Sequence, residues 1–230
     1  MIVLIDADIV AYRCAASAEI EPVEVALWRV DGLMTDILKE TGCQEYKAFL
    51  TGENNFRYKV FNEYKANRLK TPRPIHLKAC QEHLVSNWNA LFSDGCEADD
   101  LLGIEQTALS HEVDATCIAS IDKDLLTIPG KHYNFVKKEW SLVSPADARH
   151  RFYTSILTGD AADGIKGAIG IGPKKAETIL KGCETEEEYY QACLNFFSCE
   201  EELLQNALCL YIQRKEGEVW KPPMESSTLA

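Results

Sequence analysis

CEADDLLGIEQTA, at residues 96–108, sets three acidic side chains at the start of an apolar, helix-like pattern. On a helix, positions three apart share a face, so Glu97 and Asp100 point the same way and Asp99 lies beside them. Like charges about 4 Å apart repel by ~1 kcal/mol in water and by several times that near a protein surface. A hard cation with oxygen ligands offsets such repulsion. By itself the stretch fits a metal site and a solvated acidic helix start equally well, because carboxylates also suit a helix N-terminus.

Three other acidic clusters favour the metal site. Two of them follow apolar, strand-like runs, at residues 1–5 and 116–120, and the third precedes a glycine-rich segment. The carboxyl ends of parallel strands meet at one edge of a sheet, where α/β proteins place their sites. Acids gathered there need divalent cations, and Mg²⁺ or Mn²⁺ suits an all-oxygen site. Two ions roughly 3.5–4 Å apart would activate a water and stabilise the leaving oxygen of a phosphodiester. The acids are Asp6 and Asp8, Glu97, Asp99 and Asp100, Asp122 and Asp124, and Asp160 and Asp163.

Hydrophobic periodicity predicts an α/β protein. Short apolar runs rich in β-branched residues indicate strands, and longer amphipathic patterns between turn residues indicate helices. We expect strands at 1–5, 46–50 and 116–120, a hairpin at 132–143, and helices at 22–40, 75–92 and 145–157, followed by two polar helices. These elements predict a mainly parallel sheet flanked by helices.

The composition limits the cellular compartments and the classes of protein that fit this sequence. The 230 residues, 46% of them hydrophobic, predict one domain, or one domain with a small appendage. No basic region precedes the first apolar run, and no apolar run approaches the roughly 18 residues of a membrane span. The nine cysteines are scattered without a CxxC pair, which favours reduced thiols over a zinc site or a disulfide framework. We therefore expect a cytoplasmic protein without a membrane partner.

The charge distribution leaves room for a nucleic acid. The net charge of −12 argues against such a partner, but the basic residues are clustered. Residues 57–78 carry seven of them, beginning with Arg57, against one acid, and residues 166–181 carry a second cluster. A protein with an acidic pocket and separate basic patches can still bind a polyanion.

A glycine-rich segment predicts contact with a nucleic-acid backbone. GAIGIGPKKAETIL, at residues 167–180, places glycines before a proline and a helix that begins with two lysines. Glycines allow close approach of a ligand, and the N–H groups at a helix start attract a phosphate. This is the sequence shape of a helix-hairpin-helix, which binds the backbone without reading bases. An ordinary glycine-rich turn is the alternative. The expected DNA-binding residues here are Gly170, Gly172, Lys174 and Lys175.

Five ordered motifs resemble the 5′-nuclease (flap endonuclease) superfamily, and most of all the short phage 5′→3′ exonucleases. They are LIDAD, EYKANR, EADDLLG, SIDKDLLTIPG and LTGDAADGIKGAIGIGPKKA, and the likeness runs from about residue 2 to residue 182. The resemblance implies a PIN-like catalytic α/β domain over residues 1–150. It implies a helical region over residues 151–230, with a helix–three-turn–helix at about 155–182 that binds duplex DNA.

The resemblance also assigns roles to residues. It implies two-metal hydrolysis by Mg²⁺ or Mn²⁺, with Asp6, Glu97, Asp99, Asp100, Asp122, Asp124, Asp160 and Asp163 as the metal-site acids. Lys65 and Arg68 become the pair that holds and polarises the scissile phosphate, and their spacing would place them on one face of a helix. Tyr12 becomes an aromatic that stacks on a displaced base, with a core tyrosine as the alternative.

Substrates and further ligands follow from the same resemblance. The expected partner is double-stranded DNA with a 5′ end, nick or flap, and an RNA–DNA hybrid is a second candidate. Arg57 is expected to contact DNA, and K⁺ to bind at the helix-hairpin-helix. These activities belong to DNA replication and repair, and a phage-encoded protein would act in the host cytoplasm.

The chain departs from the family in three places. The family often has an aspartate after the second strand, where this chain has Gly52. Asp8 stands where many relatives have a polar or acidic residue, so its role stays open. The span between Arg68 and Glu97 is short for a full helical arch, which puts strict threading of long 5′ flaps in doubt.

Two other functions fit part of the sequence. A haloacid-dehalogenase-type phosphatase begins with D-x-D after its first strand, as Asp6 and Asp8 do here, but it leaves the other acidic motifs and the glycine hairpin unexplained. A non-catalytic structure-specific DNA-binding protein would use the hairpin and the basic segment alone. Loss of an acid at a metal position would favour it, and Gly52 is such a position.

Overall fold

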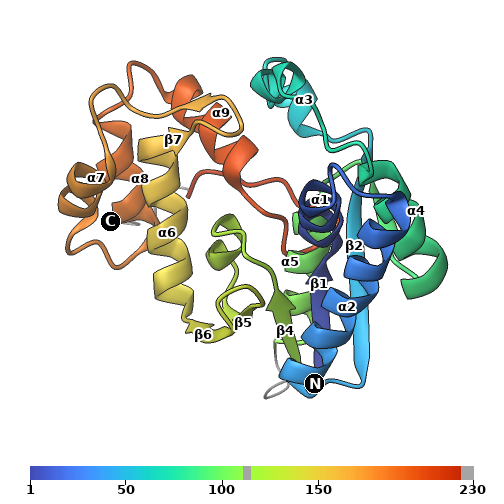
Figure 1. The fold of residues 1–230 in the computed structure, drawn as a ribbon. Helices are drawn as coiled ribbons and strands as arrows, with labels where there is room; N and C mark the ends of the chain where they lie inside the picture. Colours follow the sequence, from blue (N-terminus) through green and yellow to red (C-terminus); the bar gives the residue numbers. More distant parts are fainter. Residues whose placement is uncertain (111–114, 224–230) are drawn as a thin grey trace. The chain divides into compact units, whose positions relative to one another are not determined.

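The computed structural model describes residues 1–110 and 115–223, without the side chains of residues 69 and 70 (Figure 1). The chain forms two compact units. The first, called the sheet unit here, consists of Met1–Phe56, Pro72–Ser144 and Ile212–Gly217. The second, called the helical unit, consists of Arg57–Thr71, Pro145–Tyr211 and Glu218–Ala230, of which 224–230 lie outside the described residues. The expected domains, 1–150 and 151–230, differ from these units in three segments. Residues 57–71 and 145–150 belong to the helical unit, and residues 212–217 belong to the sheet unit.

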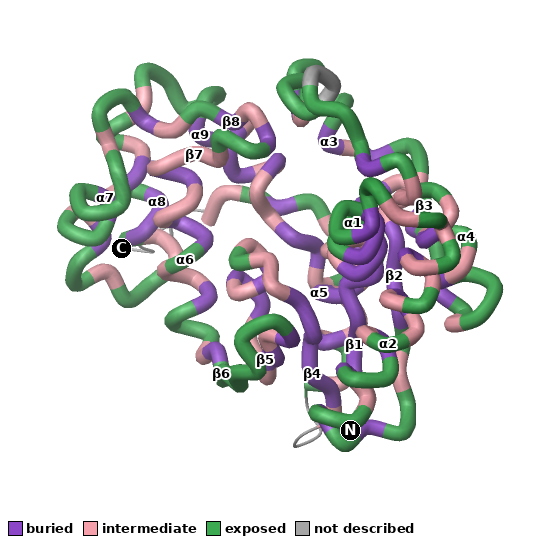
Figure 2. Tube along the Cα trace, in the orientation of Figure 1, coloured by how far each residue is buried: buried purple, intermediate pink, exposed green. Residues whose placement is uncertain are grey.

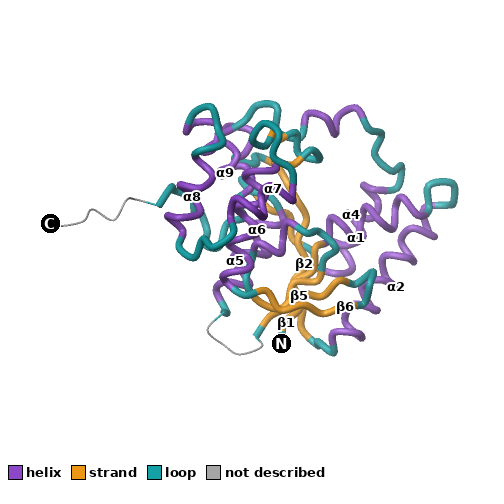
Figure 3. The backbone as a smooth tube through the Cα atoms, turned by 90° about the vertical axis from the view of Figure 1, so that its left-hand side faces the viewer, coloured by secondary structure: helices purple, strands orange, loops and turns teal. Residues whose placement is uncertain are grey.

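A six-stranded, mainly parallel sheet forms the centre of the sheet unit, as the sequence predicts (Figure 3). The strand order is β3-β2-β1-β4-β5-β6. All neighbours run parallel except β5 and β6, which form the expected hairpin. The strands are β1 (Ile2–Asp6), β2 (Glu45–Glu53), β3 (Leu91–Asp94), β4 (Thr116–Ala119), β5 (Gly130–Asn134) and β6 (Glu139–Val143).

Helices cover both faces of this sheet, which explains why its central strands are apolar throughout. Val3 and Ile5 of β1 share a core with α1 (Ala7–Ser17), α2 (Val23–Thr41) and α4 (Leu77–Trp88). Leu4 points to the opposite face and packs with Leu102 of α5 (Ala98–Ala108). Strands β1 and β4 are consequently buried along nearly their whole length (Figure 2).

The helical unit has a core of its own. It contains α6 (Pro145–Thr158), α7 (Pro173–Leu180), α8 (Glu186–Leu194), α9 (Glu200–Leu210), the short α3 (Arg57–Val60), the 3₁₀ helix η1 (Ala66–Lys70) and the small hairpin of β7 (Gly159–Asp160) and β8 (Ile165–Lys166). Tyr153, Leu180, Tyr190 and Trp220 lie in its core, so the C-terminal helices, which carry no motif, build the unit that contains the glycine hairpin. Among the described helices none is long and apolar enough to cross a membrane.

Candidate functional site

Asp6 marks the carboxyl end of β1 and caps the N-terminus of α1. Its carboxylate accepts hydrogen bonds from the Ile9 amide (3.1 Å) and the Ser120 hydroxyl (2.6 Å), and the residue is 2% exposed. The pKa of Asp6 is raised to about 7, mainly by burial and also by the nearby charges of Asp8 and Asp122, and against the lowering effect of the Ser120 hydrogen bond. The acids that follow β1 and β4 are therefore close enough to repel one another, which is the environment that a divalent cation stabilises.

The neighbouring strand ends carry the other acids of this edge. The Asp122 amide donates to the Ser120 hydroxyl (2.9 Å), so one serine joins the acids of β1 and β4. The Asp124 amide donates to the Asp122 carboxylate (2.9 Å), and the Thr51 amide, in β2, donates to Asp8 (2.9 Å). Backbone and hydroxyl donors thus hold the carboxylates of Asp6, Asp8 and Asp122 in place.

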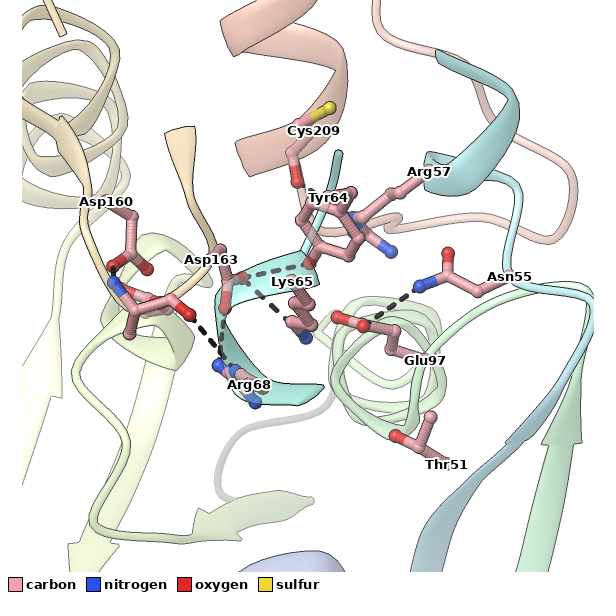
Figure 4. Close-up of polar contacts among 12 residues, drawn as sticks. Thr51, Asn55, Arg57, Tyr64, Lys65, Arg68, Glu97, Asp160, Asp163 and Cys209 are labelled. Carbon is pink, nitrogen blue, oxygen red and sulfur yellow. Dashed lines mark hydrogen bonds and ion pairs between the residues drawn. The ribbon is translucent and has the colours of Figure 1, made fainter. Parts of the chain in front are cut away.

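The acidic helix start has a more specific arrangement than the sequence predicts. Glu97 is the N-cap of α5, and it forms a capping box with Asp100. Its carboxylate accepts a hydrogen bond from the buried Asn55 amide group (2.9 Å; Figure 4). Asp100 is 0% exposed, and its two oxygens accept the backbone amides of Glu97 and Gln213, each at 2.9 Å. Asp99 is half-buried in the first turn.

These acids fit a metal centre by their chemistry. Within residues 1–110 and 115–223 no three His, Cys, Asp or Glu side chains converge on one point as a ready-made metal site. The donors at the strand ends are nevertheless all carboxylates, and Ser120 contacts both the Asp6 carboxylate and the Asp122 amide. Hard divalent cations with oxygen ligands suit this donor set.

In the helical unit, Asp163 forms the centre of a charged network (Figure 4). One of its oxygens accepts the Tyr64 hydroxyl (2.9 Å) and lies 3.6 Å from the Lys65 ammonium. The other forms an ion pair with the Arg68 guanidinium. Asp163 is 8% exposed, so its carboxylate is shielded from water, whereas the Arg68 side chain is 55% exposed. The predicted phosphate-holding cations and one predicted metal acid therefore belong to a single network.

Lys65 and Arg68 do not meet in the way that their spacing predicts. Lys65 has a left-handed backbone (φ 56°) and precedes η1, so the two residues do not share a face of one helix. They converge because both reach the same carboxylate. The backbone reinforces the arrangement, since the Lys65 amide donates to the Asp163 carbonyl (2.8 Å) and Asn67 donates to the Ala161 carbonyl (2.7 Å). Asp160 accepts the Ala162 amide (2.7 Å) in the same turn.

Arg57 corrects the expectation of a DNA contact. It is 2% exposed, and it donates to the carbonyls of Cys209 (2.8 Å) and Tyr211 (2.7 Å) at the end of α9. A guanidinium engaged with helix C-terminal carbonyls is a structural anchor.

Tyr12 is 49% exposed, so the alternative of a core tyrosine is wrong.

The glycine hairpin presents its basic residues at the start of α7. Gly170 has a positive φ of 73°, and Gly172 is the N-cap before Pro173. Lys174 is exposed, whereas the Lys175 ammonium donates to the Gly170 carbonyl (2.8 Å) and braces the turn. Both lysines are exposed at this helix start, where the helix dipole favours an anion.

The presence of glycine at position 52 has a steric explanation. A Cβ atom at this position would lie 2.0 Å from the Ser93 carbonyl oxygen, because β2 and β3 approach closely where their register shifts. The aspartate that the family resemblance leads one to expect here does not fit this backbone. Sequence reasoning also missed Ser120, Tyr64 and Asn55 as partners of the acids; the first two lie inside the acidic and basic motifs, and Asn55 carries no signal of its own.

The sequence of this chain is similar to a family of nucleases and to several curated proteins. The sequence profile described as "5'-3' exonuclease, N-terminal resolvase-like domain" matches residues 1–153. DNA polymerase I of Deinococcus radiodurans is 27% identical over 173 residues, which cover 70% of this chain and 18% of that protein. The 5'-3' exonuclease of Mycoplasma pneumoniae is 30% identical over 157 residues, which cover 58% of this chain and 52% of that protein. This chain thus spans half or less of the length of several curated relatives.

Solved structures show the same fold. The T5 D15 protein, crystallised with metal ions, superimposes with a TM-score of 0.73 at 18% sequence identity, covering 91% of this chain and 89% of that chain. A complex of the bacteriophage T5 flap endonuclease with DNA and metal ions gives a TM-score of 0.68. The central sheet with flanking helices is accordingly the fold of the 5′ nucleases.

Proposed function

Because this chain belongs to the 5′–3′ exonuclease family, we propose that it hydrolyses phosphodiesters at the 5′ ends of DNA with the help of divalent metal ions. The observation that carries this proposal is the buried Asp6, whose carboxylate accepts the Ser120 hydroxyl, which in turn accepts the Asp122 amide. Such a concentration of acids at the ends of parallel strands suits hydrolysis by metal-bound water. Membership of this family leaves the haloacid-dehalogenase-type phosphatase without support.

The sheet unit supplies the proposed metal ligands. Asp6, Glu97, Asp99, Asp122 and Asp124 would hold Mg²⁺ or Mn²⁺, which when bound supplies an activated water and stabilises the leaving oxygen. Ser120 orients Asp6, and Asn55 orients Glu97. Fixed orientation of this kind keeps ligands in place before the ions arrive. The family resemblance extends the metal-site role to Asp160 and Asp163.

The helical unit supplies cations and a DNA-binding hairpin. Lys65 and Arg68 would bind and polarise the scissile phosphate, with Asp163 holding both side chains ready. Gly170, Gly172, Lys174 and Lys175 would bind the backbone of duplex DNA, with K⁺ at the hairpin, and Tyr12 of the sheet unit would stack on a base. The T5 flap endonuclease, a structural neighbour in complex with DNA, supports DNA as the substrate. A nick, a 5′ flap and an RNA–DNA hybrid are the substrate forms to compare, and the cytoplasm is the proposed location.

End-labelled DNA tests the reaction directly. Blunt, nicked and 5′-flap duplexes are incubated with Mg²⁺, Mn²⁺ or EDTA, and the released products are sized. We expect metal-dependent release from the 5′ end. Asp122→Asn should abolish cleavage and leave duplex binding intact, while Asp36→Asn, which alters an exposed acid on α2, should cleave normally. Binding of all three duplexes without any cleavage would instead support a non-catalytic DNA-binding protein.

A further inference from the structure

After α9 the chain returns to the sheet unit as a short segment, Ile212–Gly217. Ile212 is 5% exposed and packs in the core that contains Leu102 and Ile128. The Gln213 amide donates to Asp100 (2.9 Å), and the Arg214 guanidinium donates to the Thr127 carbonyl (3.0 Å). We call this segment the returning segment. It fastens the acidic helix to the turn that follows the acids of β4.

Gly103 makes room for the returning segment. A Cβ atom on Gly103 would lie 2.5 Å from the Gln213 carbonyl oxygen and 3.0 Å from the Ile212 side chain. The backbone of the returning segment therefore lies directly against α5, one turn after the acids. Only glycine allows such close contact at a helix face.

Asp100 joins this segment to the start of α5. It is 0% exposed, and one oxygen accepts the Gln213 amide while the other accepts the Glu97 amide. Hydrogen bonds from backbone amides to an ionised carboxylate are stronger than neutral ones. A buried carboxylate whose two oxygens both accept amides is directed toward the protein backbone, in contrast to the half-buried Asp99 beside it.

We propose that Asp100 is a positioning residue that clasps the returning segment to the first turn of α5, and thereby fixes Glu97 and Asp99 for the metal ions without ligating them itself. This proposal rests on the proposed function, because it assigns the metal ions to Glu97 and Asp99. It replaces the metal-ligand role that the sequence predicts for Asp100. It also gives residues 212–217, which carry no recognisable motif, a part in building the site.

Thermal unfolding in EDTA separates a clasp from a ligand. Asp100→Asn keeps the shape of the side chain but replaces one carboxylate oxygen with an NH₂ group. This NH₂ group would face the backbone amide of Glu97 or Gln213, which is also a donor. We expect its midpoint in EDTA to fall by roughly 3–12 °C, the shift that corresponds to a lost hydrogen bond to a charged group. Asp99→Asn is the matched control, and its midpoint in EDTA should stay level or rise because one like charge is removed. An unchanged midpoint for Asp100→Asn would overturn the proposal.

A second variant tests the positioning without changing any acid. Gly103→Ala should displace the returning segment, lower the midpoint in EDTA and weaken Mn²⁺ binding several-fold, measured by calorimetry below the unfolding transition. Gly32→Ala, on α2 with nothing within 4 Å, should do neither. If Gly103→Ala is destabilised but binds Mn²⁺ with wild-type affinity, the returning segment stabilises the fold without positioning the metal ligands. That result would overturn the positioning role of Asp100. If Asp99→Asn also binds Mn²⁺ normally, the proposed metal site fails, whereas the EDTA result for Asp100 still stands.

Discussion

Asp31, on α2, accepts hydrogen bonds from two side chains of α4. Its carboxylate lies 2.6 Å from the His83 ring and 2.7 Å from the Trp88 indole nitrogen. Burial raises the pKa of Asp31, but the Trp88 and His83 hydrogen bonds lower it more, so it lies below the ordinary value of 3.8. A carboxyl group whose pKa is lower in the folded protein stabilises the fold above its unfolded pKa. That stabilisation is lost as the pH falls through the folded pKa.

Asp31→Asn should therefore destabilise the protein at neutral pH and have a smaller effect in acid. Because Asp31 is partly exposed, we expect a loss of about 1 kcal/mol or less at neutral pH. The difference from wild type should shrink as the pH falls below 3.8, the ordinary pKa. Urea unfolding across this range measures it, with Asp36→Asn on the same helix as the control. A difference that grows in acid would contradict this explanation.

Among the elements, the packing of β2 against β3 excludes an acidic residue at position 52. Gly52→Asp, which introduces the acid that the family resemblance leads one to expect, should lower stability by about 1–3 kcal/mol or more, because even its Cβ overlaps the Ser93 carbonyl. Urea unfolding and a cleavage assay check this, with Gly32→Ala as a glycine replacement in open space. Wild-type stability in Gly52→Asp would mean that β2 and β3 can separate at little cost.

The start of α7 is the element that we expect to bind DNA. Lys174→Ala should weaken binding to all duplex sequences equally and reduce the slope of log affinity against log salt by about 1, as loss of one phosphate contact does. Fluorescence anisotropy in EDTA measures this without cleavage. Lys39→Ala removes another exposed lysine, near the end of α2, and should leave the slope unchanged. An unaltered slope in Lys174→Ala would argue against the hairpin as the DNA-binding element.

Most elements could be predicted from the sequence because each has a local signal. The runs at residues 1–5 and 116–120 correspond to β1 and β4, and the pattern at residues 22–40 corresponds to α2. Lys65 was harder to predict, since its left-handed backbone depends on the contact of its amide with Asp163, far along the chain. The burial of Arg57 likewise depends on the end of α9. Such long-range partners leave no periodic pattern.

At the scale of the whole molecule, the acids at the strand ends were predictable from the parallel sheet, but the role of Asp100 was not. Its partner, the Gln213 amide, is a backbone group, which the sequence does not distinguish from any other. Gly103 was the only local sign, because a glycine inside a helical pattern often marks close approach of another backbone. The two units also exchange segments, so no single cut in the chain separates them.

A fragment of residues 1–150 should consequently be unstable. It lacks the returning segment, so Asp100 loses the Gln213 amide and the core around Leu102 loses Ile212. We expect this fragment to unfold in a broad transition at low denaturant concentration. Circular dichroism measures that transition. Joining residues 212–217 to the fragment through a flexible linker should recover part of the stability. Equal stability with and without these residues would show that the returning segment contributes little.

The separation of Asp100 from Gln213 along the chain also affects synthesis. The two residues lie 113 positions apart, and a ribosome adds roughly 5–20 residues per second. The nascent acidic helix therefore waits on the order of ten seconds for its second amide partner, whereas isolated helices and hairpins form within microseconds. During that interval Leu102 lacks the cover of Ile212, and the growing chain presents an incomplete core that a chaperone can recognise.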